Sequence, residues 1–118
     1  MSDGRLRQTM LLDFYGELLT QRQRLCFDMH FNEDLSLSEI AEQCGISRQG
    51  VWENIRRAES ALEDIEAKTG LVRRFEEQRQ ALETVRKQLE ELTRNSQGGA
   101  ARQSMQILRE VEDMIARG

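Results

Sequence analysis

The chain has 118 residues and a mass of 13.7 kDa, enough for one compact domain with a short appendage but not for two large cores. Hydrophobic residues make up 38% of it and charged residues 32%, and no stretch approaches the roughly 20 apolar residues of a membrane-spanning helix. Proline is absent while Glu, Gln, Arg, Leu and Ala are abundant, so we expect an all-α fold. With two cysteines and no apolar segment of a signal peptide near the start, a cytoplasmic protein is expected.

The net charge of −4 is unevenly distributed along the chain. Residues 1–68 carry eight Lys and Arg against thirteen Asp and Glu, a balance of −5, whereas residues 69–118 carry nine against eight, a balance of +1. Nucleic-acid-binding proteins usually present a basic patch or stripe, so the acidic first part disfavours tight binding of duplex DNA. Fifteen of the seventeen cations are arginines, whose planar guanidinium suits phosphate and carboxylate partners.

Two helices are predicted before residue 32. The first spans residues 5–19, because apolar side chains recur there at steps of three and four residues; they are Leu6, Met10, Leu11, Phe14, Leu18 and Leu19. Thr20 and Gln23 have the spacing of a capping box, which opens a second helix ending near Phe31. We expect this second helix to direct four apolar residues inward, namely Leu25, Cys26, Met29 and Phe27.

A helix-turn-helix follows. Ser36 and Glu39 repeat the capping-box spacing and begin a short helix, which Gly45 ends because glycine readily adopts a positive φ. Ser47 is placed to cap the next helix, which continues to about Lys68. Its apolar side consists of Val51, Ile55, Ala58 and Leu62, and Gly70 stops it. Two helices joined by a three-residue turn with glycine are typical of this motif, so residues 1–70 are predicted to form a helix-turn-helix domain.

Residues 71–118 are predicted to form a helical tail. Residues 71–94 carry a heptad seam with one polar interruption, made of Leu71, Phe75, Gln78, Leu82, Val85, Leu89 and Leu92. Residues 95–100 (NSQGGA) form a break, and a last helix is expected over residues 101–116 with Met105, Leu108, Val111, Met114 and Ile115 on one side. An apolar stripe requires a partner, so the tail is a helical hairpin or a coiled coil. The seam residues that serve dimerisation or tail packing are Phe75, Leu82, Val85, Leu89 and Leu92, within one chain or between two.

No catalytic, cofactor or metal site is evident in the sequence. His30 is the single histidine, no HExxH or phosphate-binding glycine loop occurs, and no second cysteine lies near Cys26 or Cys44. Free cysteine is among the most buried residue types, so we interpret both as core residues, with a metal or redox pair as the minor alternative. We therefore expect a protein that is not an enzyme.

The second helix of the motif offers a candidate nucleic-acid or partner surface. Its outward residues are Arg48, Gln49, Trp52, Glu53, Arg56 and Arg57. Arg48 and Gln49 suit guanine and adenine edges, and Arg56 and Arg57 suit phosphates. Trp52 could stack on an unpaired base, anchor a protein or pack on the domain. Residues 36–61 carry three arginines against four acids, so a role as scaffold or protein-docking surface stays open beside nucleic-acid binding.

Residues 10–71 resemble known helix-turn-helix families. The LTxRQ opening, the SLSEIAE helix and GISRQGV, all within LLTQRQRLCFDMHFNEDLSLSEIAEQCGISRQGVWENIRRAESAL, resemble the promoter-reading region 4 of bacterial sigma factors. The chain is still more similar to the YlxM family of small bacterial helix-turn-helix proteins, through MLLDFYGELLT (residues 10–20) and ISRQGVWENIRRAESALEDIEAKTGL (residues 46–71). The positions that match the family pattern are Ser47, Arg48, Gln49, Val51, Asn54, Ile55 and Arg57. Trp52 replaces an expected tyrosine, and Arg24 replaces an expected apolar residue.

The resemblance implies an accessory or regulatory protein of the signal recognition particle pathway, because YlxM genes usually lie beside those of the particle. Such a protein would bind the particle's RNA or its GTPase protein through the recognition helix, with no membrane contact. One alternative is a dimeric transcriptional regulator that reads duplex DNA, two copies being joined through residues 71–116. Another is a protein-interaction module whose hairpin supplies the docking face.

Overall fold

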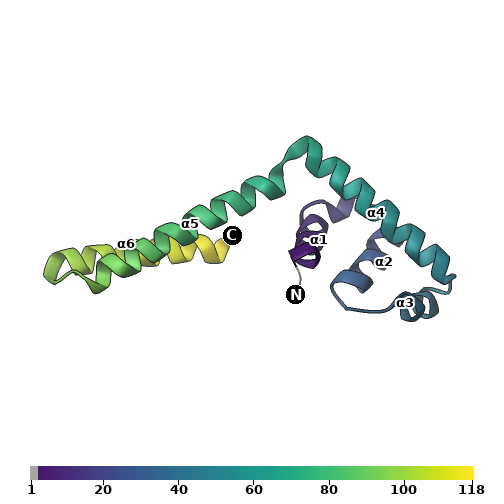
Figure 1. Ribbon diagram of the computed structural model, residues 1–118, viewed down its shortest axis with the longest axis horizontal. Coiled ribbons are helices and arrows are strands. Elements are labelled where there is room, and N and C mark those ends of the chain that lie inside the picture. Colours follow the sequence, from purple (N-terminus) through teal and green to yellow (C-terminus); the bar gives the residue numbers. More distant parts are fainter. Residues whose placement is uncertain (1–2) are drawn as a thin grey trace. The chain divides into compact units, whose positions relative to one another are not determined.

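The computed structural model describes residues 3–118, which form six α-helices and one 3₁₀ turn and contain no strand (Figure 1). The elements are α1 (Asp3–Tyr15), η1 (Gly16–Leu18), α2 (Gln21–Phe31), α3 (Leu37–Cys44), α4 (Arg48–Thr69), α5 (Leu71–Arg94) and α6 (Gly98–Arg117). They divide into two compact units, one ending at Val72 and the other comprising Arg73–Gly118. The all-α prediction is confirmed. Over the described residues, no helix combines the length and apolarity needed to cross a bilayer.

The first unit is built around α4, against which α1, α2 and α3 all pack (Figure 1). Each packing helix contributes at least one fully buried side chain to a single core, among them Leu11, Phe27 and Ile40. Helix α4 contributes Val51, Ile55, Ala58 and Leu62, the four residues that the sequence predicts for its inner side. Truncating a buried leucine such as Leu62 to alanine costs about 2–5 kcal/mol, so the packing on α4 contributes much of the stability of this unit.

The structure contains the helix caps that the sequence predicts at the starts of α2 and α3. The hydroxyls of Thr20 and Ser36 accept hydrogen bonds from the backbone N–H groups of Gln23 and Glu39, whose side chains bond back to the cap residues. Between α3 and α4, Gly45 adopts a φ of +67°. This left-handed conformation is favourable for glycine and costs free energy for residues that carry a side chain. The capping boxes and the helix-turn-helix are therefore confirmed.

The first helix ends before the predicted residue 19. The α-helix stops at Tyr15, and Gly16–Leu18 tighten into a 3₁₀ turn closed by the bond from Leu19 N to Gly16 O. A Cβ at Gly16 would lie 3.0 Å from Leu12 Cδ1, so glycine at this position leaves room for the Leu12 side chain beside the 3₁₀ turn. The buried residues are Leu11, Leu12 and Tyr15, whereas Leu6 and Leu18 are exposed.

The inward set of α2 also differs in part from the expectation. Cys26 and Phe27 are fully buried and Met29 packs partly on the core. Leu25, however, is 43% exposed. Two adjacent residues on a helix differ by about 100° in direction, so a core centred on Cys26 and Phe27 turns the side chain of Leu25 toward solvent.

A buried hydrogen-bond cluster joins the end of α4 to α1 and to the first turn of α5. The Tyr15 hydroxyl donates to Oε1 of Glu66 at 2.6 Å, and the backbone N–H of Val72 donates to the same oxygen at 3.0 Å. The Tyr15 hydroxyl also lies 2.5 Å from Oγ1 of Thr69. Glu66 is 7% exposed, and a carboxylate at this depth is tolerated because it is hydrogen-bonded. The sequence gives no sign of this cluster, because Glu66 reads as one more charge on a polar helix.

The second unit is an antiparallel pair of helices, α5 from Arg73 onward and α6 (Figure 1). The Thr93 and Ser104 hydroxyls lie 2.9 Å apart near the turn. At the other end, a Cβ at Gly118 would lie 3.7 Å from the ring of Phe75. Helix α6 begins at Gly98 rather than at the predicted residue 101, and the alanines at 100 and 101 favour a helix at this point.

The heptad seam predicted on α5 is only half enclosed within the chain. Phe75, Leu82 and Leu89 are partly buried, whereas Val85 and Leu92 are exposed. The positions that complete the enclosed stripe are Arg86 and Thr93, both partly buried. The enclosed stripe shares the row of Phe75, Leu82 and Leu89 with the predicted seam but continues on the row of Arg86 and Thr93, so it lies to one side of the seam. The tail therefore folds as a hairpin with part of its predicted seam left open.

We expect Tyr15→Phe to lower the free energy of unfolding by about 1–2 kcal/mol, because it deprives buried Glu66 of a hydrogen-bond donor. Urea denaturation followed by circular dichroism measures this change. Glu17→Gln, at an exposed carboxylate of the neighbouring turn, is the control and should change the free energy by less than about 0.5 kcal/mol. Equal free energies for Tyr15→Phe and the unaltered chain would contradict a stabilising role for the cluster.

Candidate nucleic-acid interface

The first turns of α4 have one buried side and one open side. Ser47 accepts a hydrogen bond from the backbone N–H of Gly50 at 3.0 Å, and this cap sets the start of the helix. Val51 and Ile55 anchor the buried side in the core. Since residues at intervals of three and four share a helix face, the intervening residues project away from the core.

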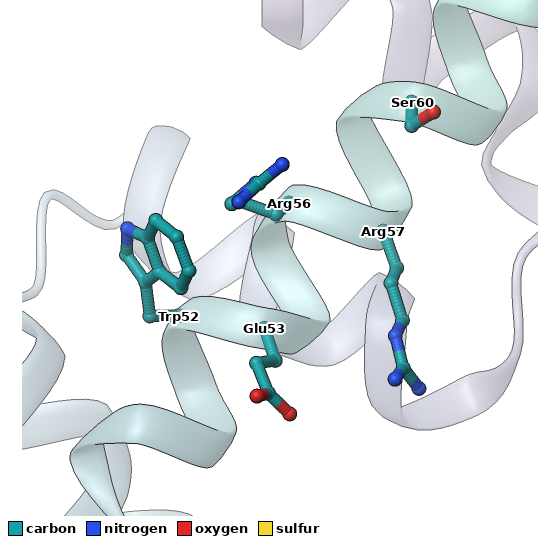
Figure 2. Close-up of a pocket in the computed structure, with 5 residues that line it drawn as sticks. All are labelled: Trp52, Glu53, Arg56, Arg57 and Ser60. Carbon is teal, nitrogen blue, oxygen red and sulfur yellow. The ribbon is translucent and has the colours of Figure 1, made fainter.

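All six residues predicted for the interface are exposed along this open side, and they are Arg48, Gln49, Trp52, Glu53, Arg56 and Arg57. The two at the first turn, Arg48 and Gln49, are where a recognition helix presents side chains to base edges. The other four lie one and two turns further on. Figure 2 shows Trp52 and Arg56 together on one side of α4, with Glu53 and Arg57 projecting in another direction.

Trp52 and Arg56 form a stacked pair. The guanidinium carbon of Arg56 lies 4.8 Å from the centre of the indole ring (Figure 2), a cation–π contact worth about 0.5–1 kcal/mol at an exposed site. Trp52 remains 42% exposed. The structure therefore does not pack this indole into the domain, which was one of the three roles left open by the sequence.

A shallow hollow of about 330 Å³ lies over this part of the helix and is lined by Trp52, Glu53, Arg56, Arg57 and Ser60 (Figure 2). Ser60 was missed by the sequence reasoning. The signal that could have found it is the spacing of Trp52, Arg56 and Ser60, since residues four apart along a helix lie on one face.

The arginines of this surface form no salt bridge with described carboxylates of the chain. Elsewhere in the unit Arg5 pairs with Asp34 at 2.7 Å and Arg7 pairs with Glu63 at 2.8 Å. Among the side chains of residues 4–118, by contrast, no carboxylate lies within 4.0 Å of the guanidinium of Arg48, Arg56 or Arg57. Three unpaired guanidinium groups on one helix are available to phosphate or carboxylate groups of a ligand.

The acids that make residues 36–61 negative are not all at this surface. The Glu39 carboxylate accepts the backbone N–H of Ser36 at 3.1 Å and so belongs to the cap of α3. Glu59 lines a different hollow, together with Arg5 and His30. The hollow on α4 has two arginines against the single carboxylate of Glu53. The charge sum over the segment thus understates how basic the open side of α4 is.

The two cysteines lie beside each other in the core region of α2 and α3. Cys26 is fully buried and Cys44 is partly buried, and both are free thiols. Burial, followed by the neighbouring Cys44 thiol, raises the pKa of Cys26, which disfavours the reactive thiolate. Among the described residues no group of three His, Cys, Asp or Glu side chains could hold a metal ion. His30 lies at the boundary of the core, with Nδ1 3.1 Å from the carbonyl oxygen of Leu35.

Comparison with known proteins adds the family. The family described as "Putative helix-turn-helix protein, YlxM / p13 like" matches residues 2–101. The chain belongs to the UPF0122 family. This membership confirms the resemblance to YlxM proteins, and it agrees with the motif formed by α3, the turn at Gly45 and α4.

UPF0122 proteins of several bacteria are similar over most of their length. The protein of Thermoanaerobacter sp. (strain X514) is 49% identical over 90 residues, which cover 76% of this chain and 77% of that protein. The protein of Acetivibrio thermocellus is 42% identical over 106 residues, which cover 90% and 88%. The protein of Halalkalibacterium halodurans is 36% identical over 108 residues, which cover 92% and 99%. The similarity therefore extends into the second unit.

The stacked pair on α4 can be tested by fluorescence, because Trp52 is the only tryptophan in the chain. We expect Arg56→Ala to raise the acrylamide quenching constant of Trp52, since the substitution uncovers one face of the indole. Arg57→Ala is the matched control, because Arg57 projects away from the ring (Figure 2). Equal quenching constants in the two variants, at unchanged helix content, would contradict the pairing.

Proposed function

We propose that this UPF0122 protein is an accessory factor of the signal recognition particle pathway and binds the particle's RNA through the open side of α4. It acts in the cytoplasm and catalyses no reaction. In this proposal residues 1–70 are the binding domain and residues 71–118 are a tail that mediates association. The observation that carries the proposal is a half-exposed indole flanked by three unpaired arginines on the recognition helix. The resemblance of residues 10–71 to YlxM proteins supports the choice of pathway.

Each residue of the site has a distinct role in this binding. Arg48 and Arg57 contact phosphates, which guanidinium groups do with charge-assisted hydrogen bonds. Trp52 stacks on an unpaired base, an interaction worth about 1–3 kcal/mol per base. Arg56 holds the indole in place through the contact at 4.8 Å. Gln49 has an amide suited to the edge of an adenine, and Glu53 disfavours ligands in which a phosphate would lie beside it.

Two features favour RNA with unpaired bases over duplex DNA. A duplex keeps its bases stacked and paired, so the face of Trp52 finds no base to stack on, whereas specific RNA recognition relies on unstacked bases in loops and bulges. The affinity of duplex binding depends on neutralising many phosphates, and this chain has a net charge of −4. A site with few cations and an exposed indole is better matched to a loop.

The second candidate is a dimeric regulator that reads duplex DNA. It is favoured by Arg48 and Gln49, which are exposed at the first turn of α4, where recognition helices meet base edges in the major groove. In that case the affinity would fall steeply with salt, and a palindromic site would be protected.

Binding to reconstituted signal recognition particle RNA, with and without its GTPase protein, tests the proposal. The measurement is made at physiological salt with an excess of unrelated duplex DNA as competitor. We expect saturable binding that survives the competitor, and we expect Arg48→Glu combined with Arg57→Glu to weaken it roughly a hundredfold, because two charge-assisted contacts are lost.

The matched control is Arg94→Glu combined with Arg102→Glu, which changes the net charge equally at exposed arginines of the tail. It should leave the affinity within about threefold of the original value, since distant surface changes couple weakly. Equal losses in the two double variants would indicate a general charge effect and contradict a site on α4. Binding to the GTPase protein in the absence of the RNA, with no binding to the RNA by itself, would overturn the choice of RNA. Loss of binding in the presence of the competitor DNA would overturn it as well.

A further inference from the structure

The hairpin of α5 and α6 has two unlike outer sides. Two observations fix an antiparallel register: the Thr93 and Ser104 hydroxyls lie 2.9 Å apart, and Phe75 and Gly118 line the same small hollow. The stripe that faces inward comprises Phe75, Leu82, Arg86, Leu89 and Thr93 on α5 and Ala101, Ser104, Leu108, Val111 and Ile115 on α6, all partly or fully buried. With these as the a and d positions of heptads, each helix has one flanking row at e and another at g. In an antiparallel pair the two e rows lie on one side and the two g rows on the other.

The side formed by the e rows is charged. Glu76, Glu83 and Glu90 follow each other at intervals of seven residues on α5, and Arg86 bonds to both Glu83 and Glu90. The Arg86 guanidinium holds the pKa of the Glu83 carboxyl below its usual range. Helix α6 contributes Met105 and Glu112 to the same side. Such a side is stable in contact with water.

The side formed by the g rows is apolar and open. It carries Val85 and Leu92 on α5 and Ile107 and Met114 on α6, each between 41% and 53% exposed. Because the helices run in opposite directions, these four alternate along the hairpin as one continuous stripe. The remaining g positions, Gln78 and Ala100, are uncharged. No charged residue therefore occupies either g row from Gln78 to Met114, on a hairpin that is otherwise densely charged.

The interior of the hairpin is too small and too polar to account for this pattern alone. Val111 and Ser104 are the only residues of Arg73–Gly118 that are nearly fully buried, and Arg86, Thr93 and Ser104 occupy inward positions. Units of this size rarely fold on one core without further association. The heptad seam predicted on α5 contains both its d and g rows, so it is wider than one partner helix can cover.

We propose that two copies of this chain associate through the stripe of Val85, Leu92, Ile107 and Met114 to form a four-helix bundle. A second copy fits this surface because a two-fold axis places the same stripe on both partners, and an uncharged stripe is complementary to itself. Each α5 then packs its d row on α6 of its own chain and its g row on the other hairpin. This association is independent of what α4 binds.

The test is the mass of the full chain in solution, by sedimentation equilibrium over about a hundredfold range of concentration, because dimers dissociate by mass action. We expect twice the 13.7 kDa of one chain. Ile107→Glu should weaken the association roughly a hundredfold, because it places a charge in a buried contact. The matched control is Met105→Glu, which alters a residue of the same helix with 43% exposure on the charged side, and should leave the dimer intact.

Thermal unfolding separates association from folding. Ile107 is exposed in the single chain, so Ile107→Glu should keep the helix content while making the midpoint lower and independent of concentration. If this variant loses its helices, Leu92→Gln on α5 serves instead, with the same expected loss of dimer. A mass of one chain at all concentrations, another stoichiometry, or equal effects of Ile107→Glu and Met105→Glu would overturn the proposal.

Discussion

The burial of one side of α4 is the constraint on which the first unit depends. Val51, Ile55, Ala58 and Leu62 form a stripe that α1, α2 and α3 cover together, and burying such side chains contributes most of the stability of a small domain. The same burial fixes which residues face outward. Because a helix cannot rotate once one side is enclosed, the packing of these four residues leaves Arg48, Trp52 and Arg56 facing solvent.

The open side of α4 has arginines without salt bridges, whereas several charged residues elsewhere in the unit are engaged in contacts within the chain. Arg5 and Arg7 bind carboxylates within the chain, Glu39 caps α3, and Glu66 is enclosed with Tyr15. What remains on α4 is a pair of neighbouring arginines, a third at its first turn and an indole under one guanidinium. A site of this kind, with few charges and one stacking surface, suits a ligand that offers an unpaired base.

The sequence predicts most of the helix boundaries because caps are local. Thr20, Ser36 and Ser47 each accept a hydrogen bond from the backbone N–H three residues further on, and Gly45 and Gly70 adopt the positive φ that ends a helix. It also predicts the outward residues of α4, since a helix with a clear apolar side has only one other side. It cannot predict the cluster of Tyr15 and Glu66, because residues 51 positions apart meet only in the folded chain. Nor does it predict which residues of the α5 seam pack on α6, because heptad spacing is the same whether one helix or several cover the stripe.

The emission of Trp52 during titration with particle RNA tests the central claim most directly, because the single tryptophan reports on the proposed contact itself. Stacking of a base on the indole predicts strong, saturable quenching by the RNA, weaker quenching by a duplex DNA of equal length, and loss of the quenching when Arg48 and Arg57 are replaced by glutamate. Binding of the RNA with unchanged emission would contradict a role for Trp52 in stacking. Equal quenching by the duplex would contradict the preference for unpaired bases.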